Sequence, residues 1–351
     1  MLFDLSTLRL AGMAMGLAAM FIGFRSLRSD SPSRGNDLLI MALGAAALAT
    51  SAFPQLANLP SDLIDMRNKE SGRLITLLII STAALWILLM DERSKNEKMR
   101  HQFDQLVRVT AMGAFSPGGD LEALQGGTVI LMPAFEEEEN IGKVVPRIPK
   151  TIAGAPAVTL VIDDGSGDDT AKVAAEAGAI VVRNPFNRGG GAALRLGYDA
   201  AVVLKPKVVV TMDADGQHQP EEIEQLVAPI MEGKADIIVG SRVLGTREKD
   251  SLVRWAGIHI FNGVINLLMG ANITDCSSGF RAFRLEAIRG LNLVQDQYHT
   301  AELIIVAAKA GLVIKEEPIH ISKRLSGTSK KGANLFYGFR FLRTVIKTWI
   351  R

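Results

Sequence analysis

Cysteine is nearly absent from this 351-residue chain, and Cys276 is the single example. A disulfide framework within the chain is therefore excluded, and the composition fits a reducing compartment. Histidine is also scarce, and His101, His259 and His320 lack the spacing of metal ligands. Positive and negative charges nearly cancel to a formal net charge of +2, which gives no sign of nucleic-acid binding.

Long apolar runs are present, and they are concentrated before residue 91. They cover residues 10–24, 38–59 and 74–90. A membrane-crossing helix needs about 20 mostly apolar residues, so we predict a transmembrane region with about three helices over residues 1–91. The first run is not typical of a signal peptide, because its basic residues follow the apolar segment instead of preceding it. A buried helical hairpin of a soluble domain is the alternative for this region.

Basic residues follow the third apolar run, at Arg93, Lys95, Lys98, Arg100 and Arg108. The positive-inside rule then favours a cytoplasmic location for the chain after residue 91. Residues 92–125 are predicted to form a cytoplasmic helical linker that continues out of the third run. The sequence Ser-Pro-Gly-Gly at 116–119 is expected to break that helix.

From Thr128 onward, short β-rich runs alternate with helical segments. Strands are predicted at 128–132, 157–163, 179–183, 207–213 and 235–240, and helices at 138–149, 168–177, 190–204, 220–232 and 252–268. This alternation is typical of an α/β fold with a mostly parallel sheet and helices on both faces. Ligands of such sheets bind beyond the carboxyl ends of the strands.

Acidic residues follow the first two predicted strands. Glu136 to Glu139 open a helix, where carboxylates suit the positive end of the helix dipole, and for Glu138 and Glu139 capping is a sufficient explanation. Asp163 and Asp164 end the second strand. A turn and a helix cap explain much of this second pattern, but an acid pair in the crevice can also bind ribose hydroxyls or base amines.

The most specific pattern is Asp213-Ala214-Asp215, at the end of the fourth strand. Two carboxylates one residue apart at a strand end can share a hard divalent cation, because Mg²⁺ and Mn²⁺ prefer oxygen ligands and accept phosphate oxygens and water as well. A metal on a diphosphate would neutralise charge on a departing nucleotide. We expect His218 to be a nearby loop residue and not a ligand.

The glycine-rich sequence at 187–194 is not a dinucleotide-binding fingerprint. The third glycine position is Leu194, and the run follows the third strand instead of the first. It is better explained as a tight loop at a helix N-terminus that approaches a phosphate or a sugar.

Seven motifs together resemble the family-2 glycosyltransferases, which have a GT-A (nucleotide-diphospho-sugar transferase) fold. In chain order they are PAFEEEENI, IDDGSGDD, NRGGGAALRLG, MDADGQHQP, GSR at 240–242, SSGFRAF at 277–283 and RLSGTSK at 324–330. The pattern is most similar to dolichyl- or polyprenyl-phosphate mannose (hexose) synthases. The resemblance covers about residues 126–332, and the N-terminal runs resemble a membrane domain sometimes fused ahead of such enzymes.

The resemblance implies a role for each matching position. The nucleotide-sugar pocket would be formed by Pro133, Phe135, Glu137, Ile162, Asp164, Asp213, Ala214 and Arg242; the metal would be held by Asp213, Asp215 and Gln217; and catalytic roles near the phosphates or the sugar would fall to Asp215, Arg254, Arg324, Lys330 and Glu302, with Ser329 beside Lys330. Glu136 departs from the family pattern, which usually has Asn there.

The implied reaction is a single inverting displacement that moves a hexose from a nucleotide-sugar to a polyprenyl or dolichyl phosphate. GDP-mannose and UDP-glucose are both open as donors. A lipid monophosphate is largely dianionic near neutral pH and needs little deprotonation. Because nucleotide-sugars are cytoplasmic, the resemblance agrees with the orientation inferred from charge.

Residues 333–351 mix aromatic and aliphatic residues with Arg340, Arg343 and Lys347. This is typical of a basic amphipathic helix at a membrane surface, and a helix packed on the catalytic domain is an equal alternative. Two other functions are considered: a family-2 enzyme with a glycan or another lipid as acceptor, and an inactive membrane scaffold. The scaffold is disfavoured because the acids at the strand ends are all present.

Overall fold

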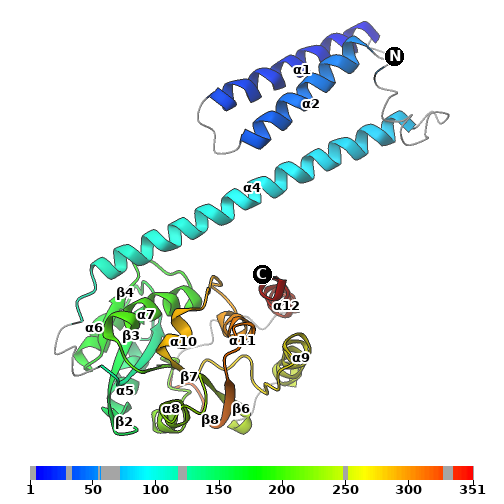
Figure 1. Ribbon diagram of the computed structural model, residues 1–351. Helices are drawn as coiled ribbons and strands as arrows, with labels where there is room; N and C mark the ends of the chain where they lie inside the picture. The colour runs from blue at the N-terminus through cyan, green and yellow to red at the C-terminus, as the bar shows by residue number, and fades with distance from the viewer. Residues whose placement is uncertain are drawn as a thin grey trace. The chain divides into compact units, whose positions relative to one another are not determined.

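The computed structural model describes residues 5–28, 34–53, 56, 72–117, 125–247, 252–326 and 335–350. It divides into two compact units, residues 1–101 and 102–351. The boundary falls inside a long helix, α4 (Gly72–Gly113), which is labelled in Figure 1. This helix confirms that the segment after the third apolar run is helical and continuous with it.

In the first unit, α1 (Leu5–Arg28) and α2 (Arg34–Ala52) pack against each other through two glycines. A Cβ on Gly16 would lie 2.7 Å from the carbonyl oxygen of Gly44, and a Cβ on Gly44 would lie 2.8 Å from that of Gly16. Because any side chain would separate the backbones, these two positions require glycine.

None of the helices in the described part of the chain has both the length and the apolarity that crossing a membrane requires. The first apolar run lies within α1, the start of the second within α2 and the third within α4. Side chains of residues 72–80 in α4 lie outside the described part. The transmembrane region therefore stays a prediction.

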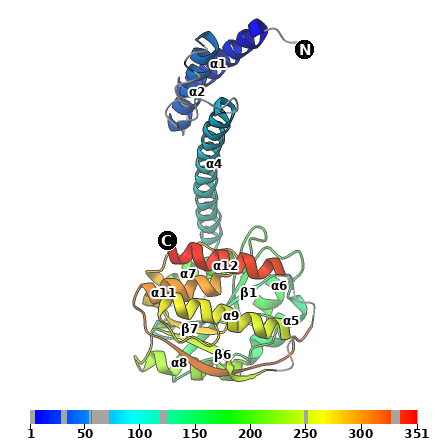
Figure 2. The same ribbon diagram turned by 90° about the vertical axis from the view of Figure 1, so that its right-hand side faces the viewer.

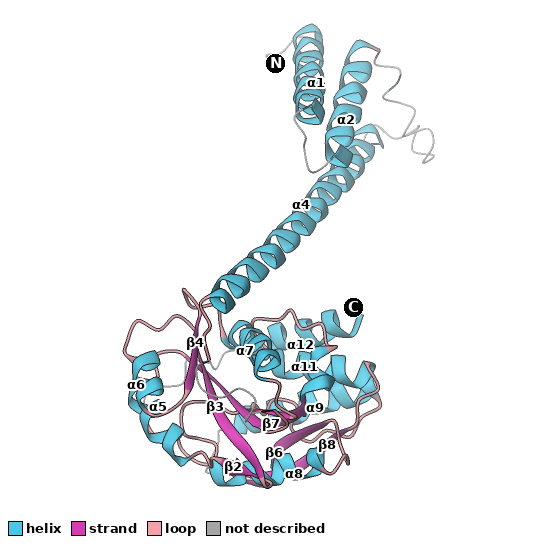
Figure 3. Ribbon diagram, turned by 60° about the vertical axis from the view of Figure 1, so that its left-hand side comes forward, coloured by secondary structure: helices cyan, strands magenta, loops and turns pink. Residues whose placement is uncertain are grey.

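Among the described residues of the second unit, eight strands form a mixed sheet with the order β2-β3-β1-β5-β7-β6-β8, and β4 pairs with β3. Figure 3 draws the strands in magenta. The strands are β1 (Thr128–Ala134), β2 (Thr151–Ile152), β3 (Ala155–Asp163), β4 (Ile180–Arg183), β5 (Val208–Thr211), β6 (Ile237–Arg247), β7 (Arg281–Arg284) and β8 (Ile314–Ile321). Strands β1, β3, β4 and β5 pair in parallel, and β7 runs antiparallel between β5 and β6.

The five predicted strands are confirmed, with ends that differ by at most two residues except for β6, which continues to Arg247 instead of ending at residue 240. Three further strands, β2, β7 and β8, were not predicted. Strand β7 begins and ends with arginine, and β8 has the sequence IKEEPIHI, so neither shows an apolar run or a clear alternation. Their neighbours in the sheet, and not their own composition, make them strands.

Side chains of β1 alternate between two hydrophobic cores. Val129 and Leu131 face one core, whereas Ile130 and Met132 face the other. The second core is covered by α5 (Glu138–Val144), α6 (Thr170–Glu176) and α8 (Ile223–Met231); the first is covered by α7 (Gly190–Leu204), α9 (Leu252–Met269), α10 (Leu285–Arg289), α11 (His299–Lys309), α12 (Leu335–Ile350) and the end of α4. Helices on both faces confirm the predicted layering.

The C-terminal helix α12 packs on the second unit beside α9 and α11 (Figure 2). Phe341 and Val345 are buried, and the Phe341 ring lies 4.1 Å from that of Phe261 between centroids. Of the two alternatives for this segment, packing on the second unit is therefore observed for one face. Its other face leaves Ile346 and Trp349 exposed.

The sheet brings the predicted motifs to one edge. Ala134, the last residue of β1, pairs with Asp163, the last residue of β3. On the other side of β1, Leu131 pairs with Thr211, the last residue of β5. The loops after these three parallel strands therefore start side by side, at the edge where such sheets bind ligands.

Candidate active site

The loop after β5 places Asp213 and Asp215 at this edge. The hydroxyl of Thr211 donates to the carbonyl of Gly279 at 2.7 Å, which joins this loop to the SSGF turn. A Cβ on Gly279 would lie 3.2 Å from Oδ1 of Asp213, so a larger residue would press on that carboxylate. Asp215 is buried, and its Oδ1 accepts the backbone N–H of Gln217 at 3.0 Å.

The two carboxylates disfavour each other's charge. Burial raises the pKa of Asp215, and the negative charge of Asp213 raises this pKa further; the Gln217 N–H and the charge of Arg324 offset only part of the effect. A cation bound between them would relieve this repulsion between like charges, of which Asp215 is buried and Asp213 half-buried. The donor set therefore fits Mg²⁺ or Mn²⁺, with water and phosphate oxygens completing the shell.

The other predicted metal residues have different surroundings. No cluster of three or more His, Cys, Asp or Glu side chains suited to a metal occurs within the described ranges. The side-chain amide of Gln217 donates to the carbonyl of Ser322 at 3.3 Å, so its role as a metal ligand stays a prediction. Nδ1 of His218 accepts the backbone N–H of Asp213 at 3.1 Å, and its ring stacks on Phe280. His218 thus holds the loop through these two contacts.

Arg324 connects two of the predicted acids. Its Nη2 lies 2.8 Å from Oδ2 of Asp215, and its Nη1 lies 3.2 Å from Oε1 of Glu137. The other oxygen of Glu137 accepts a hydrogen bond from Asn140 at 2.7 Å. The structure thus brings together three residues from distant motifs, which supports their assignment to one site.

The segment after β8 is held along the loop that contains Asp215. The N–H of Ser322 donates to the carbonyl of Gln217 at 3.0 Å, and the N–H of Leu325 donates to that of Asp215 at 3.2 Å. Leu325 also covers Gly216, where an added Cβ would lie 2.4 Å from the leucine Cδ1. These contacts place the backbone of Arg324, and its guanidinium is held by the ion pairs with Asp215 and Glu137. Ser329 and Lys330 lie outside the described residues.

The acid pair after β3 supports the loops around it. Oδ1 of Asp163 accepts the N–H of Ser166 at 2.8 Å, and its Oδ2 lies 2.9 Å from Nε of Arg183. Asp164 accepts hydrogen bonds from the loop between β4 and α7, at residues 184–189. Burial raises the pKa of Asp164 even though these hydrogen bonds oppose the increase. The turn explanation therefore accounts for Asp163, whereas Asp164 anchors the distant 184–189 loop, and its role at the base or ribose stays a prediction.

The remaining residues of the predicted nucleotide pocket differ in exposure. Pro133 and Phe135 are half-buried near the end of β1. The side chain of Ile162 is buried in the first core and that of Ala214 in the second, so both residues pack inside the protein beneath this edge of the sheet. Glu136 has a left-handed backbone with φ of 52°. Asn adopts that conformation more readily than most residues, which explains why the family pattern has Asn there.

Arg242 makes a two-pronged ion pair that sequence reasoning missed. Its Nε and Nη2 donate to the two carboxylate oxygens of Asp275 at 2.6 and 2.7 Å, and Nη2 also donates to Oγ of Ser277 at 2.6 Å. Burial alone would raise the pKa of Asp275, but the hydrogen bonds and charge of Arg242 outweigh it and lower the pKa. The acid just before the SSGF motif was the available signal. Arg254 lies in α9, and its side chain is outside the described residues.

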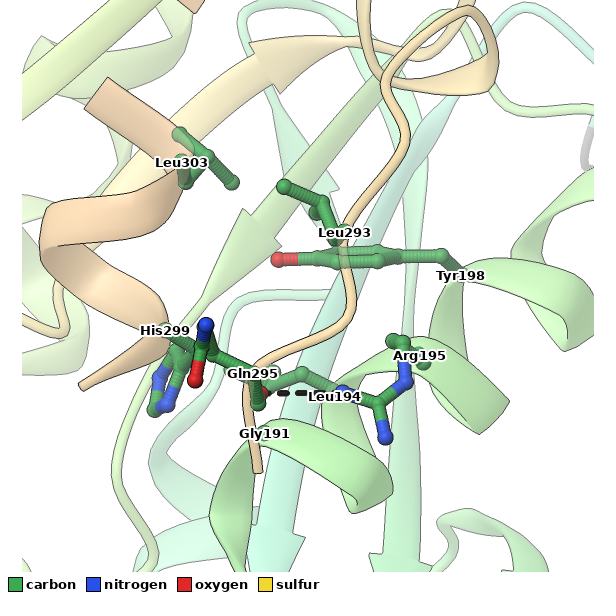
Figure 4. A pocket seen from close by; sticks show the side chains of 8 residues that line it. All are labelled: Gly191, Leu194, Arg195, Tyr198, Leu293, Gln295, His299 and Leu303. Carbon is green, nitrogen blue, oxygen red and sulfur yellow. Dashed lines mark hydrogen bonds between the residues drawn. The ribbon is translucent and has the colours of Figure 1, made fainter. Parts of the chain in front are cut away.

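Glu302 is fully buried in the first turn of α11. Its carboxylate accepts the backbone N–H groups of Val294 and Gln295 at 2.9 to 3.2 Å. This contact fixes the segment that lines the pocket in Figure 4, where His299 and Tyr198 also lie. Glu302 therefore shapes the segment, and its predicted place near the sugar stays a prediction.

Comparison with known proteins identifies the family. Residues 129–291 match the model of Glycosyl transferase family 2. The chain is 38% identical over 222 residues to an uncharacterized protein of Methanocaldococcus jannaschii, covering 62% of this chain and 90% of the relative. It is 32% identical to a polyprenol monophosphomannose synthase of Mycolicibacterium smegmatis, covering 59% and 82% of the two chains. A dolichyl-phosphate hexose transferase of Haloferax volcanii is also 32% identical, over 57% and 84%.

Solved structures agree on the fold. Glucosyl-3-phosphoglycerate synthase from Mycobacterium tuberculosis, in complex with Mn²⁺, uridine-diphosphate and phosphoglyceric acid, aligns with a TM-score of 0.51 at 21% identity, covering 68% of this chain and 84% of that one. The chain belongs to glycosyltransferase family 2. It is therefore a glycosyltransferase with a GT-A-like α/β fold, as the motifs predicted.

Proposed function

We propose that this enzyme transfers a hexose from a nucleotide-sugar to a polyprenyl or dolichyl phosphate. The observation that carries the proposal is the pair formed by the half-buried Asp213 and the buried Asp215 in the loop after β5, with Arg324 paired to Asp215. Relatives named for polyprenol and dolichyl phosphate support this class of acceptor.

Asp213 and Asp215 would hold a divalent cation, which supplies neutralisation of the negative charge on the leaving diphosphate when it is bound. Arg324 adds a fixed positive charge beside Asp215, and Glu137 orients this guanidinium from the other side. An acceptor phosphate is already dianionic for the most part, so these residues act by positioning and charge stabilisation and need no dedicated base. A single displacement at the anomeric carbon inverts its configuration.

The lipid acceptor implies a membrane location, with the catalytic unit on the cytoplasmic side. The exposed face of α12 supports this proposal, since Leu342, Ile346 and Trp349 lie beside Arg343 and Lys347 on the outward-facing side of the helix. Apolar side chains next to cations suit the interface of an anionic bilayer. The predicted transmembrane region of residues 1–91 would anchor the chain in the same membrane.

The test uses membranes that contain the full chain, polyprenyl phosphate, Mn²⁺, and labelled GDP-mannose or UDP-glucose. We expect label to enter the organic phase in a product labile to mild acid, and we expect Asp215→Ala to abolish it. Glu286→Gln is the matched control and should retain activity, because Glu286 is an exposed acid in α10 that is distant in sequence from Asp215. Label in a water-soluble or acid-stable product would instead favour a glycan or another lipid as acceptor.

The donor can be identified separately. A nucleotide that binds only the folded state raises the unfolding temperature, so GDP and UDP are compared with Mn²⁺ present. We expect one of the two to stabilise the wild type and neither to stabilise Asp215→Ala. Stabilisation of the variant equal to that of the wild type would contradict the assignment of the metal site.

A further inference from the structure

The last turns of α4, which belong to the second unit, contain a buried carboxylate with three arginine neighbours. Oδ1 of Asp104 accepts hydrogen bonds from Nη2 of Arg188 and, at 2.9 Å, from Nη2 of Arg195. Its Oδ2 lies 3.4 Å from Nε of Arg108. Burial alone would raise the pKa of Asp104, but the hydrogen bonds from Arg195 and Arg188 outweigh it and lower the pKa. Asp104 is therefore charged at neutral pH and holds these guanidinium groups in place.

Arg188 depends on Asp104 more than the other two arginines do. Arg195 also pairs with Asp296 at 2.5 Å, and Arg108 also pairs with Asp199 at 3.2 Å. Among the described residues, Asp104 is the one carboxylate within ion-pair distance of the buried Arg188 side chain. Removing the charge of Asp104 would leave a buried cation unpaired, which is costly enough to move the side chain toward water.

The backbone of Arg188 lies beside Asp164, at the edge of the sheet where we propose that the nucleotide binds. Its N–H and that of Gly189 donate to the carboxylate of Asp164, at 3.1 and 2.7 Å to Oδ2. Asn184, at the start of the same loop, donates to Oδ1 of Asp164 at 2.8 Å. One loop, residues 184–189, is thus held by Asp104 through a side chain and by Asp164 through backbone amides.

Arg195, the second arginine that Asp104 binds, also contacts the segment before α11. Its Nη1 donates to the carbonyl of Gln295 at 2.9 Å, as the dashed line in Figure 4 shows. Gly191 lies so close to this segment that a Cβ there would collide with the same carbonyl oxygen. The carboxylate of Glu302 holds Gln295 as well, by accepting its backbone N–H. The segment before α11 and the loop before α7 therefore both connect to Asp104.

We propose that Asp104 is a positioning residue for the nucleotide-sugar, acting through Arg188 and the 184–189 loop on Asp164. The last turns of α4 are then a structural part of the donor site and not only a linker. This inference rests on the proposed function, because it assumes that the donor binds at the edge formed by Asp164, Asp213 and Asp215.

The test compares full-length Asp104→Asn with Asp199→Asn. Asp199 pairs with Arg108 on the same pair of helices, and in the described part of the chain no hydrogen bond or ion pair joins its side chain to residues 184–189, so it controls for loosening of α4. We expect Asp104→Asn to raise the donor KM and the nucleoside diphosphate Kd in Mn²⁺ by roughly tenfold, the effect of losing one hydrogen bond to a charged group, with the polyprenyl phosphate KM unchanged. Asp199→Asn should leave all three constants near wild type.

Two further measurements keep the inference open to refutation. Arg188→Met should weaken donor binding as Asp104→Asn does, and the double variant should be no weaker than either single one, because both act through one link. Hydrogen exchange of the Arg188 and Gly189 amides, without any substrate, should quicken in Asp104→Asn and not in Asp199→Asn. Asp104→Glu, which keeps the charge, serves if Asp104→Asn does not fold, and should show a smaller rise in donor KM.

The outcomes separate the two proposals. If exchange quickens and nucleotide binding weakens while no polyprenyl product forms in the wild type, the acceptor assignment fails and the role of Asp104 stands. If exchange and donor binding in Asp104→Asn match those in Asp199→Asn, or if the effects of Asp104→Asn and Arg188→Met add, the role of Asp104 is refuted.

Discussion

Replacing Glu136 by Asn should stabilise the protein. Glu136 is exposed and has a φ of 52°, a left-handed conformation that its neighbours impose. Its own N–H donates to Oγ of Ser166 at 3.0 Å, and the next N–H donates to Oγ1 of Thr170 at 2.9 Å. Because these are backbone contacts, they persist whatever side chain the position carries, and the strain of holding Glu there is removed by Asn.

The size of the effect follows from backbone preferences. A left-handed conformation costs an ordinary L-residue about 1–2 kcal/mol, and Asn is several-fold enriched there. A several-fold enrichment corresponds to roughly 0.5–1 kcal/mol of unfolding free energy. For a unit of this size we expect the unfolding temperature to rise by about 1–4 °C. Glu136→Gly should gain less, since glycine also adds freedom to the unfolded chain.

Thermal unfolding of the full chain, followed by circular dichroism, measures the change. Glu139→Asn is the matched control, because Glu139 is also exposed but lies in the first turn of α5. There the same substitution removes a charge that suits the helix dipole and lowers helix propensity, so it should destabilise by a few tenths of a kcal/mol. A lower unfolding temperature for Glu136→Asn, or the same sign for both variants, would refute the reasoning.

Two more predictions concern charged groups of the site. Asp275→Asn should cost about 3 kcal/mol, because it breaks a buried pair with Arg242. The pKa of Asp275 is lowered on folding, so its contribution is present above the unfolded pKa of about 3.9 and is lost as pH falls through the lower folded value. The difference between wild type and variant in urea unfolding should therefore shrink below about pH 4, and a constant difference down to pH 3 would contradict this origin. Asp215→Asn should raise the unfolding temperature without metal, since it relieves buried repulsion from Asp213, and should remove most of the stabilisation that Mn²⁺ gives the wild type. A variant that is less stable without metal, or that Mn²⁺ stabilises as much as the wild type, would count against a metal site shared by Asp213 and Asp215.

The site joins segments that are far apart in the chain. Arg324 and Glu137 are in contact although 187 positions separate them. The segment at 322–326 reaches this place because β8 pairs with β6 on the far side of β7, and its backbone then follows the loop after β5. The sheet order thus carries Arg324, the first residue of the RLSGTSK motif, to the acids, which makes the unpredicted strands β7 and β8 essential to the site.

Local signals in the sequence determined much of this protein. Apolar runs separated by turn residues predicted the parallel strands β1, β3, β4 and β5, and the alternation of strands with helical segments after a glycine-rich loop predicted α7 at its observed bounds, Gly190–Leu204. The position of Asp213 and Asp215 directly after an apolar strand was sufficient to place them at the ligand edge. These features depend on neighbours along the chain, which is why they could be inferred without a fold.

Tertiary structure alone decided which polar side chains meet. Asp164 and Glu302 have the sequence context of ligand-binding acids, yet both carboxylates accept backbone N–H groups of neighbouring loops. Asp104 lies in a charged helix that gave no sign of a buried role. Asp275 lies two residues before the SSGFRAF motif and was not singled out from the sequence. Pairing of buried charges depends on distances between elements remote in sequence, and such distances are set by how the helices and strands pack.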